Sequence, residues 1–169
     1  TLAGMMDQHA MPPEAFLHFV HDIDFSLLPH SAELSSLISA LPGRKIVYTN
    51  GTEPYARRVL QARGLEQNFE AVYGIEHASY RPKPRAEAFA EVFERAAVTP
   101  HSAAMFEDES RNLQVPAGLG MRTVYISPDT ASPDYVDAMH QNLEAFLSQL
   151  VAACFSKPSG GLRKNNGKL

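Results

Sequence analysis

The strongest constraint on the fold is a regular alternation of short β-rich runs and helical segments between residues 43 and 151. The β-rich runs cover residues 45–48, 71–74, 103–106 and 123–126. Helical spacing of apolar residues covers residues 53–63, 84–97, 112–119 and 135–151. Strands that alternate with helices predict βα units, and therefore a parallel sheet covered by helices in a three-layer α/β fold.

The two ends of the chain follow other patterns. Helical patterns at residues 2–9, 13–20 and 32–41 predict a small, partial helical cap subdomain over residues 1–42, followed by an α/β core over residues 43–151. Residues 152–169, whose last part is rich in Gly, Ser, Asn and Lys, are predicted to be a disordered tail. The chain does not begin with Met, which leaves open that it is a piece of a longer protein.

Composition limits the possible partners and compartments. The 169 residues carry a net charge of −4, so neither nucleic acid nor a membrane surface is an expected partner. A single cysteine, Cys154, excludes an intramolecular disulfide and a Cys-rich zinc site, and it fits a reducing, cytoplasmic location. No apolar run approaches the roughly 20 residues of a membrane span. The sequence does not indicate the oligomeric state.

Polar residues follow three of the predicted elements, at the sheet edge where open α/β sheets bind ligands. The turn at residues 49–51 offers a hydroxyl and backbone N–H groups to an anion. Lys83 lies between two prolines that stiffen its backbone, as a phosphate clamp would require. Glu107 and Asp108 end an apolar run and can hold a hard cation through oxygen.

Each of these features also has a purely structural explanation. Residues 49–51 can form an ordinary strand-to-helix turn, and Lys83 can be a solvated surface residue. Asp108 can cap the helix that follows it, but this leaves the adjacent Glu107 without a role. The order of the three features along one sheet edge therefore favours a binding site.

Three segments in this order resemble motifs of the haloacid dehalogenase-like hydrolase superfamily. KIVYTNG (45–51), RPKP (81–84) and MFEDESRNL (105–113) resemble its second, third and fourth motifs. The FEDxxxNL spacing, residues 116–121 and the stretch VHDIDFS (20–26) are similar to its pyrimidine 5′-nucleotidase branch. The resemblance implies a Rossmann-like sheet with a small helical cap and a Mg²⁺-dependent phosphomonoesterase acting on a small nucleoside 5′-monophosphate.

The resemblance also implies a role for each motif residue. Thr49 would donate a hydrogen bond to a phosphoryl oxygen, and Lys83 would neutralise the charge of phosphate and nucleophile. Asp108 would ligate Mg²⁺, and Glu107 would bind it directly or through water. Such electrostatic roles suit phosphoryl transfer. The residues expected to bind phosphate are Thr49, Asn50, Gly51 and Lys83.

The first motif of the superfamily, which supplies the nucleophilic Asp on a central strand, has one candidate here, at residues 22–26. The apolar residues 16–20 could form that strand. Pro13 at a helix start, and apolar residues on one helical face up to Ile23, favour a helix instead. Only four residues separate Ser26 from Ser31, too few for the turn and flap that follow this motif. We therefore expect residues 22–26 to belong to the cap and the central first strand to be missing.

Within a cap, His21, Asp22 and Asp24 have two open roles. They can face the active site and select the nucleoside, or they can cap the short segment that begins near Ser26. The structural role is slightly favoured.

Other functions fit the sequence less well. The main alternative is a non-catalytic module that binds phosphate, Mg²⁺ or a partner without turnover, and we expect little phosphatase activity from residues 1–169 alone. A receiver domain has the reverse order of acids and lysine. Dehalogenase chemistry needs no Mg²⁺, so the acid pair disfavours it.

Overall fold

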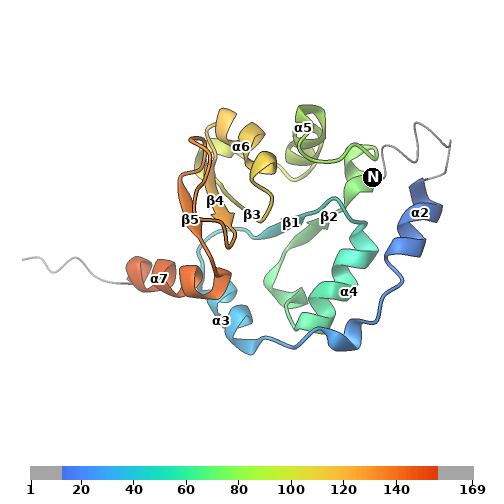
Figure 1. The fold of residues 1–169 in the computed structure, drawn as a ribbon, viewed down its shortest axis with the longest axis horizontal. Helices are drawn as coiled ribbons and strands as arrows, with labels where there is room; N and C mark the ends of the chain where they lie inside the picture. The colour runs from blue at the N-terminus through green and yellow to red at the C-terminus, as the bar shows by residue number, and fades with distance from the viewer. Residues whose placement is uncertain (1–12, 156–169) are drawn as a thin grey trace, which may run out of the picture.

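The computed structural model describes residues 13–155, and strands form the middle of its three layers (Figure 1). Strands β1 (Ile46–Tyr48) and β2 (Ala71–Tyr73) form a parallel pair. Strands β3 (Ala104–Glu107), β4 (Arg122–Ile126) and β5 (Ala138–His140) form a second parallel sheet in that order. All strands with an assigned partner are therefore parallel, as the βα alternation predicted.

Helices cover both sides of the strands, and α2 stands beside them (Figure 1). The structure contains helices α2 (Pro13–Val20), α3 (Ala32–Ala40), α4 (Glu53–Arg63), α5 (Ala86–Arg95), α6 (Gln114–Gly118) and α7 (Leu143–Phe155). Short 3₁₀ turns connect these elements at η1 (Phe25–Leu27), η2 (Glu66–Asn68), η3 (Ile75–Ala78), η4 (Pro100–Ser102) and η5 (Ser110–Leu113). This arrangement confirms the predicted three-layer α/β class.

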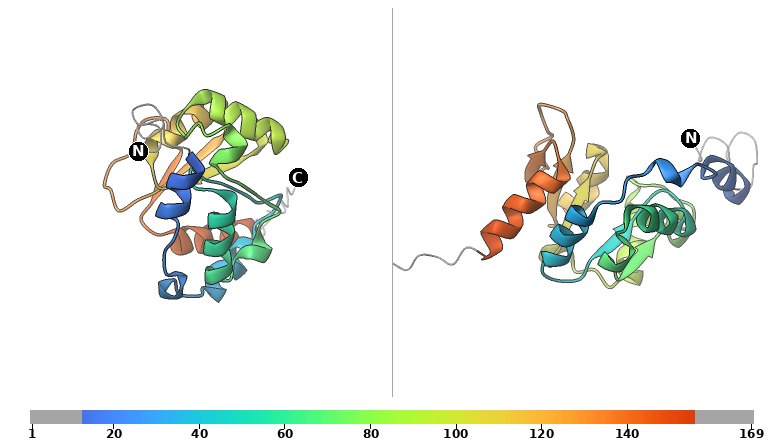
Figure 2. Two further views of the ribbon diagram at one scale, coloured as in Figure 1. Left: turned by 90° about the vertical axis from the view of Figure 1, so that its right-hand side faces the viewer. Right: turned by 90° about the horizontal axis from the view of Figure 1, so that it is seen from below.

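Alternation along the strands builds a core on each face. Val47 and Phe106 point to the face covered by α3, α4 and α7, where the buried side chains are Leu34, Ile38, Ala56, Leu60, Leu65, Val72 and Leu147. Tyr48 and Met105 point to the opposite face, where they pack against Phe89 of α5 and its neighbours. Helix α3 thus belongs to the core layers, and only the chain before it runs alongside α4 (Figure 2).

Helix α4 places the turn at residues 49–51 against the sheet edge. Its N-cap is Thr52, whose hydroxyl oxygen accepts a hydrogen bond from the Tyr55 N–H at 3.4 Å. Its end is set by Gly64, which adopts a left-handed conformation with φ of 71°. The structure confirms the predicted helix at residues 53–63 with the same bounds, and residues that favour helix ends stand on both sides of it.

The end of the chain departs from prediction. The expected helix at residues 135–151 was wrong at its start, because residues 138–140 form strand β5 beside β4 and the helix begins only at Leu143. Helix α7 continues to Phe155, so residues 152–155 of the predicted tail are helical. The predicted helix at residues 2–9 and the tail beyond residue 155 lie outside the described residues.

Strands β1 and β3, which belong to different sheets, are less buried than β4 in the middle of the second sheet. No hydrogen-bonded pairing joins β1 to β3 within residues 13–155. Strand β4 has three buried residues, whereas β1 and β3 have none. Unpaired strand edges are unusual at the centre of an α/β fold. None of the helices in the described range has the length and apolar composition needed to cross a membrane.

Candidate functional site

Lys83 links the carboxyl ends of β1 and β3. The residue is only 8% exposed, although it follows a surface loop. Its Nζ donates to the backbone oxygen of Tyr48 at 3.1 Å and to Oε1 of Glu107 at 2.5 Å. A lysine ammonium has three N–H donors, so one more can reach a ligand. The structural alternative of a solvated surface lysine is therefore wrong.

Glu107 is held from several directions. Besides Lys83, Nδ2 of Asn112 donates to Oε1 at 2.8 Å, and the N–H of Asp108 donates to Oε2 at 2.9 Å. Burial alone would raise the pKa of Glu107, but the Lys83 charge and these hydrogen bonds outweigh burial and hold the pKa below its usual value. The carboxylate is 8% exposed and stays ionised beside Lys83.

Asp108 has a different environment from its neighbour. The residue is exposed, and its contact with Glu107, its partial burial and the negative charge of Glu107 raise its pKa. The oxygens of Glu107 accept hydrogen bonds from several protein donors, whereas the side chain of the exposed Asp108 contacts only Glu107 by a side-chain hydrogen bond among the described residues. Of the two acids predicted to bind Mg²⁺, Asp108 is thus the one whose oxygens remain open to a cation.

Asn112 was not singled out by the sequence. It is 5% exposed, and its Oδ1 is buried without a partner among the described residues. Its side chain reaches Glu107 because the 3₁₀ turn η5 folds the chain back on the end of β3. The five-residue interval in FEDxxxNL was the available signal, since it matches one 3₁₀ turn after the acid pair.

The turn at residues 49–51 lies next to Lys83. Oγ1 of Thr49 accepts a hydrogen bond from the Gly51 N–H at 3.0 Å, which leaves the hydroxyl hydrogen to donate. The Asn50 side chain binds the backbone of Lys83 on both sides, through Nδ2 to the carbonyl oxygen at 3.2 Å and through Oδ1 to the N–H at 2.7 Å. Asn50 therefore positions Lys83, a role that the sequence did not indicate.

The structure thus brings the three predicted segments together at one sheet edge. The turn meets Lys83 through Asn50, and Lys83 meets the acid pair through Glu107. The catalytic and binding roles assigned to these residues stay predictions.

His21, Asp22 and Asp24 separate into different environments. Oδ1 of Asp24 accepts a hydrogen bond from the Ser26 N–H at 2.9 Å and so caps η1. Asp22 is exposed, and no strand includes residues 22–26. His21 lies against the turn at residues 49–51 and the start of α4, with Nδ1 3.3 Å from Oγ1 of Thr52. Burial lowers the pKa of His21, and the charge of Glu76 partly offsets this effect.

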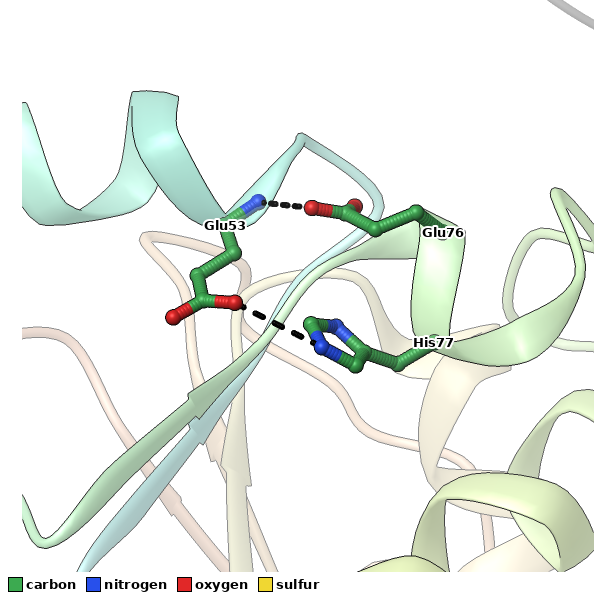
Figure 3. A group of neighbouring side chains, drawn as sticks. All are labelled: Glu53, Glu76 and His77. Atoms are coloured by element: carbon green, nitrogen blue, oxygen red, sulfur yellow. Dashed lines mark hydrogen bonds and ion pairs between the residues drawn. The ribbon is translucent and has the colours of Figure 1, made fainter.

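A second acidic cluster lies at the ends of β1 and β2 (Figure 3). One ligand atom from each of Glu53, Glu76 and His77 lies within 4.8 Å of the others, close enough to hold a metal ion. Oε1 of Glu76 accepts the Glu53 N–H at 2.8 Å and caps α4. A Cβ at Gly74 would lie 2.3 Å from Oε2 of Glu76, so this approach requires glycine.

The hydrogen bonds of His77 disfavour a metal at the second cluster. Nδ1 accepts a hydrogen bond from the Gly74 N–H at 3.0 Å, so the neutral ring carries its proton on Nε2. That Nε2 faces Oε2 of Glu53 at 3.4 Å. A protonated nitrogen has no lone pair for a metal. The cluster therefore ties η3 to the start of α4.

Comparison with known proteins identifies relatives of the fold. Residues 17–126 match the family model described as Haloacid dehalogenase-like hydrolase. The L-2-haloacid dehalogenase from Xanthobacter autotrophicus with chloropropionic acid covalently bound is 16% identical, with a TM-score of 0.64 over 88% of this chain and 71% of that one. The HAD-hydrolase YfnB from Bacillus subtilis bound to magnesium is 20% identical, with a TM-score of 0.62 over 82% and 61%.

A third similar structure is the HAD phosphatase from Thermococcus onnurineus, at 15% identity and a TM-score of 0.60 over 92% of this chain and 87% of that one. The chain spans between 57% and 71% of the length of the dehalogenase structures that it matches. No curated protein sequence matches significantly. At these identities, the solved structures establish the fold and leave the reaction to be argued from the site.

Proposed function

Because the chain belongs to the haloacid dehalogenase-like hydrolases, we propose that it provides the phosphate- and metal-binding part of a Mg²⁺-dependent phosphomonoester hydrolase. One observation carries this proposal: a buried Lys83 is held between the ends of β1 and β3 by Tyr48 and Glu107. A lysine fixed in this way can bind a phosphoryl oxygen with its remaining N–H and with little loss of entropy.

The donors at this edge fit Mg²⁺. The Asp108 carboxylate is an exposed hard oxygen ligand beside a lysine and a hydroxyl turn. Asp108 would hold the ion, and Glu107 would act indirectly by keeping Lys83 in place. When bound, Mg²⁺ would neutralise charge on the phosphoryl group. Thr49 would donate its hydroxyl hydrogen to a phosphoryl oxygen, and Asn50 would keep Lys83 oriented toward it.

The nucleophile of this hydrolase would come from an additional strand. The unpaired edges of β1 and β3 and their incomplete burial support insertion of an extended segment between them. A carboxylate at the carboxyl end of that segment would lie near Lys83 and could form an aspartyl-phosphate. The position of Asp24 as a helix cap disfavours residues 22–26 for this role.

Phosphate esters suit this site better than haloacids. Several structural neighbours are described as dehalogenases, and others are described as a phosphatase and as a hydrolase with bound phosphate and sodium. Halide displacement requires no cation, so a dehalogenase would have no use for Asp108 as a metal ligand. The motif resemblance to pyrimidine 5′-nucleotidases leads us to propose nucleoside 5′-monophosphates as substrates. Phosphate binding without turnover is the alternative for this chain alone.

Calorimetry with inorganic phosphate and Mg²⁺ tests the proposal on the chain as it exists. We expect phosphate to bind only in the presence of Mg²⁺. Asp108→Asn should weaken Mg²⁺ binding by more than about 100-fold, because loss of a direct ligand exceeds the effect of an outer partner. Its stability should stay within about 0.5 kcal/mol, because the residue is exposed. Asp134→Asn, a change at another exposed aspartate, is the control.

Hydrolysis of p-nitrophenyl phosphate separates the remaining possibilities. Residues 1–169 alone should hydrolyse little of it. Strong Mg²⁺-dependent hydrolysis that Asp22→Asn abolishes would place the nucleophile at residues 22–26. Absence of Mg²⁺-dependent phosphate binding would contradict the proposed function.

A further inference from the structure

Tyr48 contacts the ammonium of Lys83 in two different ways. Its backbone oxygen accepts a hydrogen bond from Nζ of Lys83 at 3.1 Å. The same Nζ also lies over the Tyr48 ring, 5.1 Å from the ring centre. A cation within about 6 Å of an aromatic face is attracted by the negative potential of that face. The ring is therefore a third partner of the ammonium, beside the Tyr48 carbonyl and Glu107.

The ring contact leaves Lys83 able to bind a ligand. Two of its three N–H donors bind the Tyr48 carbonyl and the Glu107 carboxylate. At 5.1 Å the ring attracts the positive charge as a whole. The third N–H therefore stays available to a phosphoryl oxygen, while the attraction of the ring stabilises the ammonium at the sheet edge.

Helix α5 fixes the orientation of the Tyr48 ring. The ring meets that of Phe89 edge-on, with centroids 5.6 Å apart and an interplanar angle of 89°. Phe89 is fully buried, and the Tyr48 ring also packs against Ala88 and Val92 of the same helix. A ring held in this way can define the position of a long lysine side chain before a ligand arrives, which lowers the entropic cost of binding.

The hydroxyl of Tyr48 contributes nothing visible to this arrangement. It is buried, and it has no hydrogen-bond partner in the part of the chain that the structure describes. Burial, and then the charge of Glu91, raise the pKa of Tyr48 to about 12, so the phenol is neutral near pH 7. A buried hydroxyl without a partner is unfavourable for folding. The ring is therefore the part of Tyr48 that serves the site.

The alternation of side chains along β1 explains how Tyr48 reaches the lysine. Val47 points to the face covered by α3, α4 and α7, and Tyr48 points to the face covered by α5. Thr49 follows at the end of the strand, and Asn50 binds the backbone of Lys83. Neighbouring residues after β1 thus hold the backbone of Lys83, while Tyr48 contacts the other end of the same side chain.

From these contacts we infer that Tyr48 is a positioning residue, whose ring holds the ammonium of Lys83 where it can bind a phosphoryl oxygen. This inference rests on the proposed function, because it assigns Tyr48 a part in phosphate binding. It gives Tyr48 no contact with the ligand itself.

Calorimetry with inorganic phosphate at saturating Mg²⁺ tests this role. Tyr48→Leu, which keeps an apolar side chain but removes the ring, should weaken phosphate binding by about tenfold. Tyr48→Phe, which keeps the ring, should bind phosphate as tightly as the unmodified chain. The affinity for Mg²⁺ without phosphate should be the same in both variants, because Asp108 would hold the ion.

Tyr73→Leu is the matched control. Tyr73 is the register partner of Tyr48 on β2, and both rings pack against the same buried residues of η3 and α5. The Tyr73 ring meets His77 edge-on, with centroids 5.5 Å apart, whereas Lys83 lies over the Tyr48 ring. The control should lose apolar packing as Tyr48→Leu does, but it should keep the affinity for phosphate.

Proton NMR of the lysine side chains gives a readout that loss of packing alone does not move. Protons above an aromatic face resonate upfield, so the ε-CH₂ signal of Lys83 should lie upfield of the other lysine signals. The signal that is absent from Lys83→Arg identifies it. The upfield position should persist in Tyr48→Phe and Tyr73→Leu and disappear in Tyr48→Leu. If circular dichroism shows that Tyr48→Leu does not fold, the signal in the unmodified chain and in Tyr48→Phe decides the result.

The possible failures are distinguishable. If Tyr48→Leu binds phosphate as tightly as the unmodified chain, or if Tyr48→Phe or Tyr73→Leu is as weak as Tyr48→Leu, the positioning role of the ring is overturned and the proposed function stands. If inorganic phosphate does not bind the unmodified chain with Mg²⁺, the proposed function fails and the positioning role fails with it.

Discussion

Two clusters of carboxylates lie at the carboxyl ends of parallel strands in this protein, and they differ in how their acids are paired and exposed. At the ends of β1 and β3, Glu107 pairs with a buried lysine while Asp108 remains exposed. At the ends of β1 and β2, Glu76 caps a helix, and Nε2 of His77 lies 3.4 Å from Oε2 of Glu53 (Figure 3). Both clusters contain two acids, and Arg57 pairs with Glu53 in the second, but only the first combines a buried lysine with an exposed acid.

The comparison teaches that proximity of acidic groups does not by itself make a metal site. The second cluster is compact enough to hold an ion, and Oε2 of Glu76 is buried without a hydrogen-bond partner among the described residues. Its other groups are engaged, however, since Oε1 of Glu76 and Nδ1 of His77 each accept a backbone N–H and Nε2 of His77 faces Glu53. The first cluster separates its two acids, one held by the protein and one open to a ligand. The first cluster is therefore distinguished by a buried lysine beside an acid whose side chain is exposed.

The largest expected effect comes from Lys83→Met. It leaves the Glu107 carboxylate buried without its counter-charge, so we expect a loss of about 3–5 kcal/mol in the free energy of unfolding. Mg²⁺-dependent phosphate binding should be lost as well. Urea unfolding followed by circular dichroism measures the first effect, and calorimetry measures the second.

Lys45→Met provides the control for that substitution. Lys45 Nζ also donates to backbone oxygens, those of Leu41 and Gly43, but it has no carboxylate partner among the described residues. Its loss should cost about 1 kcal/mol. Equal losses for the two lysine variants would contradict a special role for the Lys83–Glu107 pair.

A smaller effect is expected for Glu107→Gln, and it should depend on pH. The folded-state pKa of Glu107 is lowered, so its stabilisation is complete above its ordinary value of 4.5 and is lost as pH falls through the lower folded-state value. At pH 7 the variant should be less stable by about 1.5–3 kcal/mol. The difference in the free energy of unfolding between the variant and the unmodified protein should become smaller below about pH 4.5.

Denaturation curves at several pH values measure this dependence. Glu70→Gln serves as the comparison, because Glu70 pairs with Arg44 in solvent, with about half of each side chain exposed. It should show no comparable loss at pH 7. If Glu107→Gln lowers the free energy of unfolding by the same amount at every pH, the ion pair is not the source of the loss.

The smallest effect is expected for Glu76→Gln in the second cluster. The amide oxygen can still accept the Glu53 N–H, but the charge near the start of α4 is removed, at a cost of about 0.3–1 kcal/mol. Phosphate binding with Mg²⁺ should be unchanged. Glu87→Gln in the first turn of α5 measures the same charge effect at another helix. A large loss of Mg²⁺ binding in Glu76→Gln would reverse the assignment of the two clusters.

Local signals explain which elements could be predicted from the sequence. Helix α4 was predicted with its observed bounds from the apolar spacing of residues 53–63 and the following Gly64, and in the structure Thr52 and Gly64 cap its ends. Strand β5 was missed because residues 138–140 are few and also fit the apolar spacing of the helix that follows. A strand that short forms only because β4 offers it an edge, which is a tertiary condition.

The amino-acid order alone determined the alternation of strands and helices, and therefore that Thr49, Lys83 and Asp108 would lie at one sheet edge, because parallel strands bring their carboxyl ends together. Only the tertiary structure decided that Glu107 pairs with Lys83 while Asp108 stays exposed. It also decided that Asn50 orients Lys83 and that Asn112 orients Glu107. Asn50 and Lys83 are separated by 33 positions, and Lys83 and Glu107 by 24. Hydrogen bonds over such intervals depend on packing, for which local sequence carries no signal.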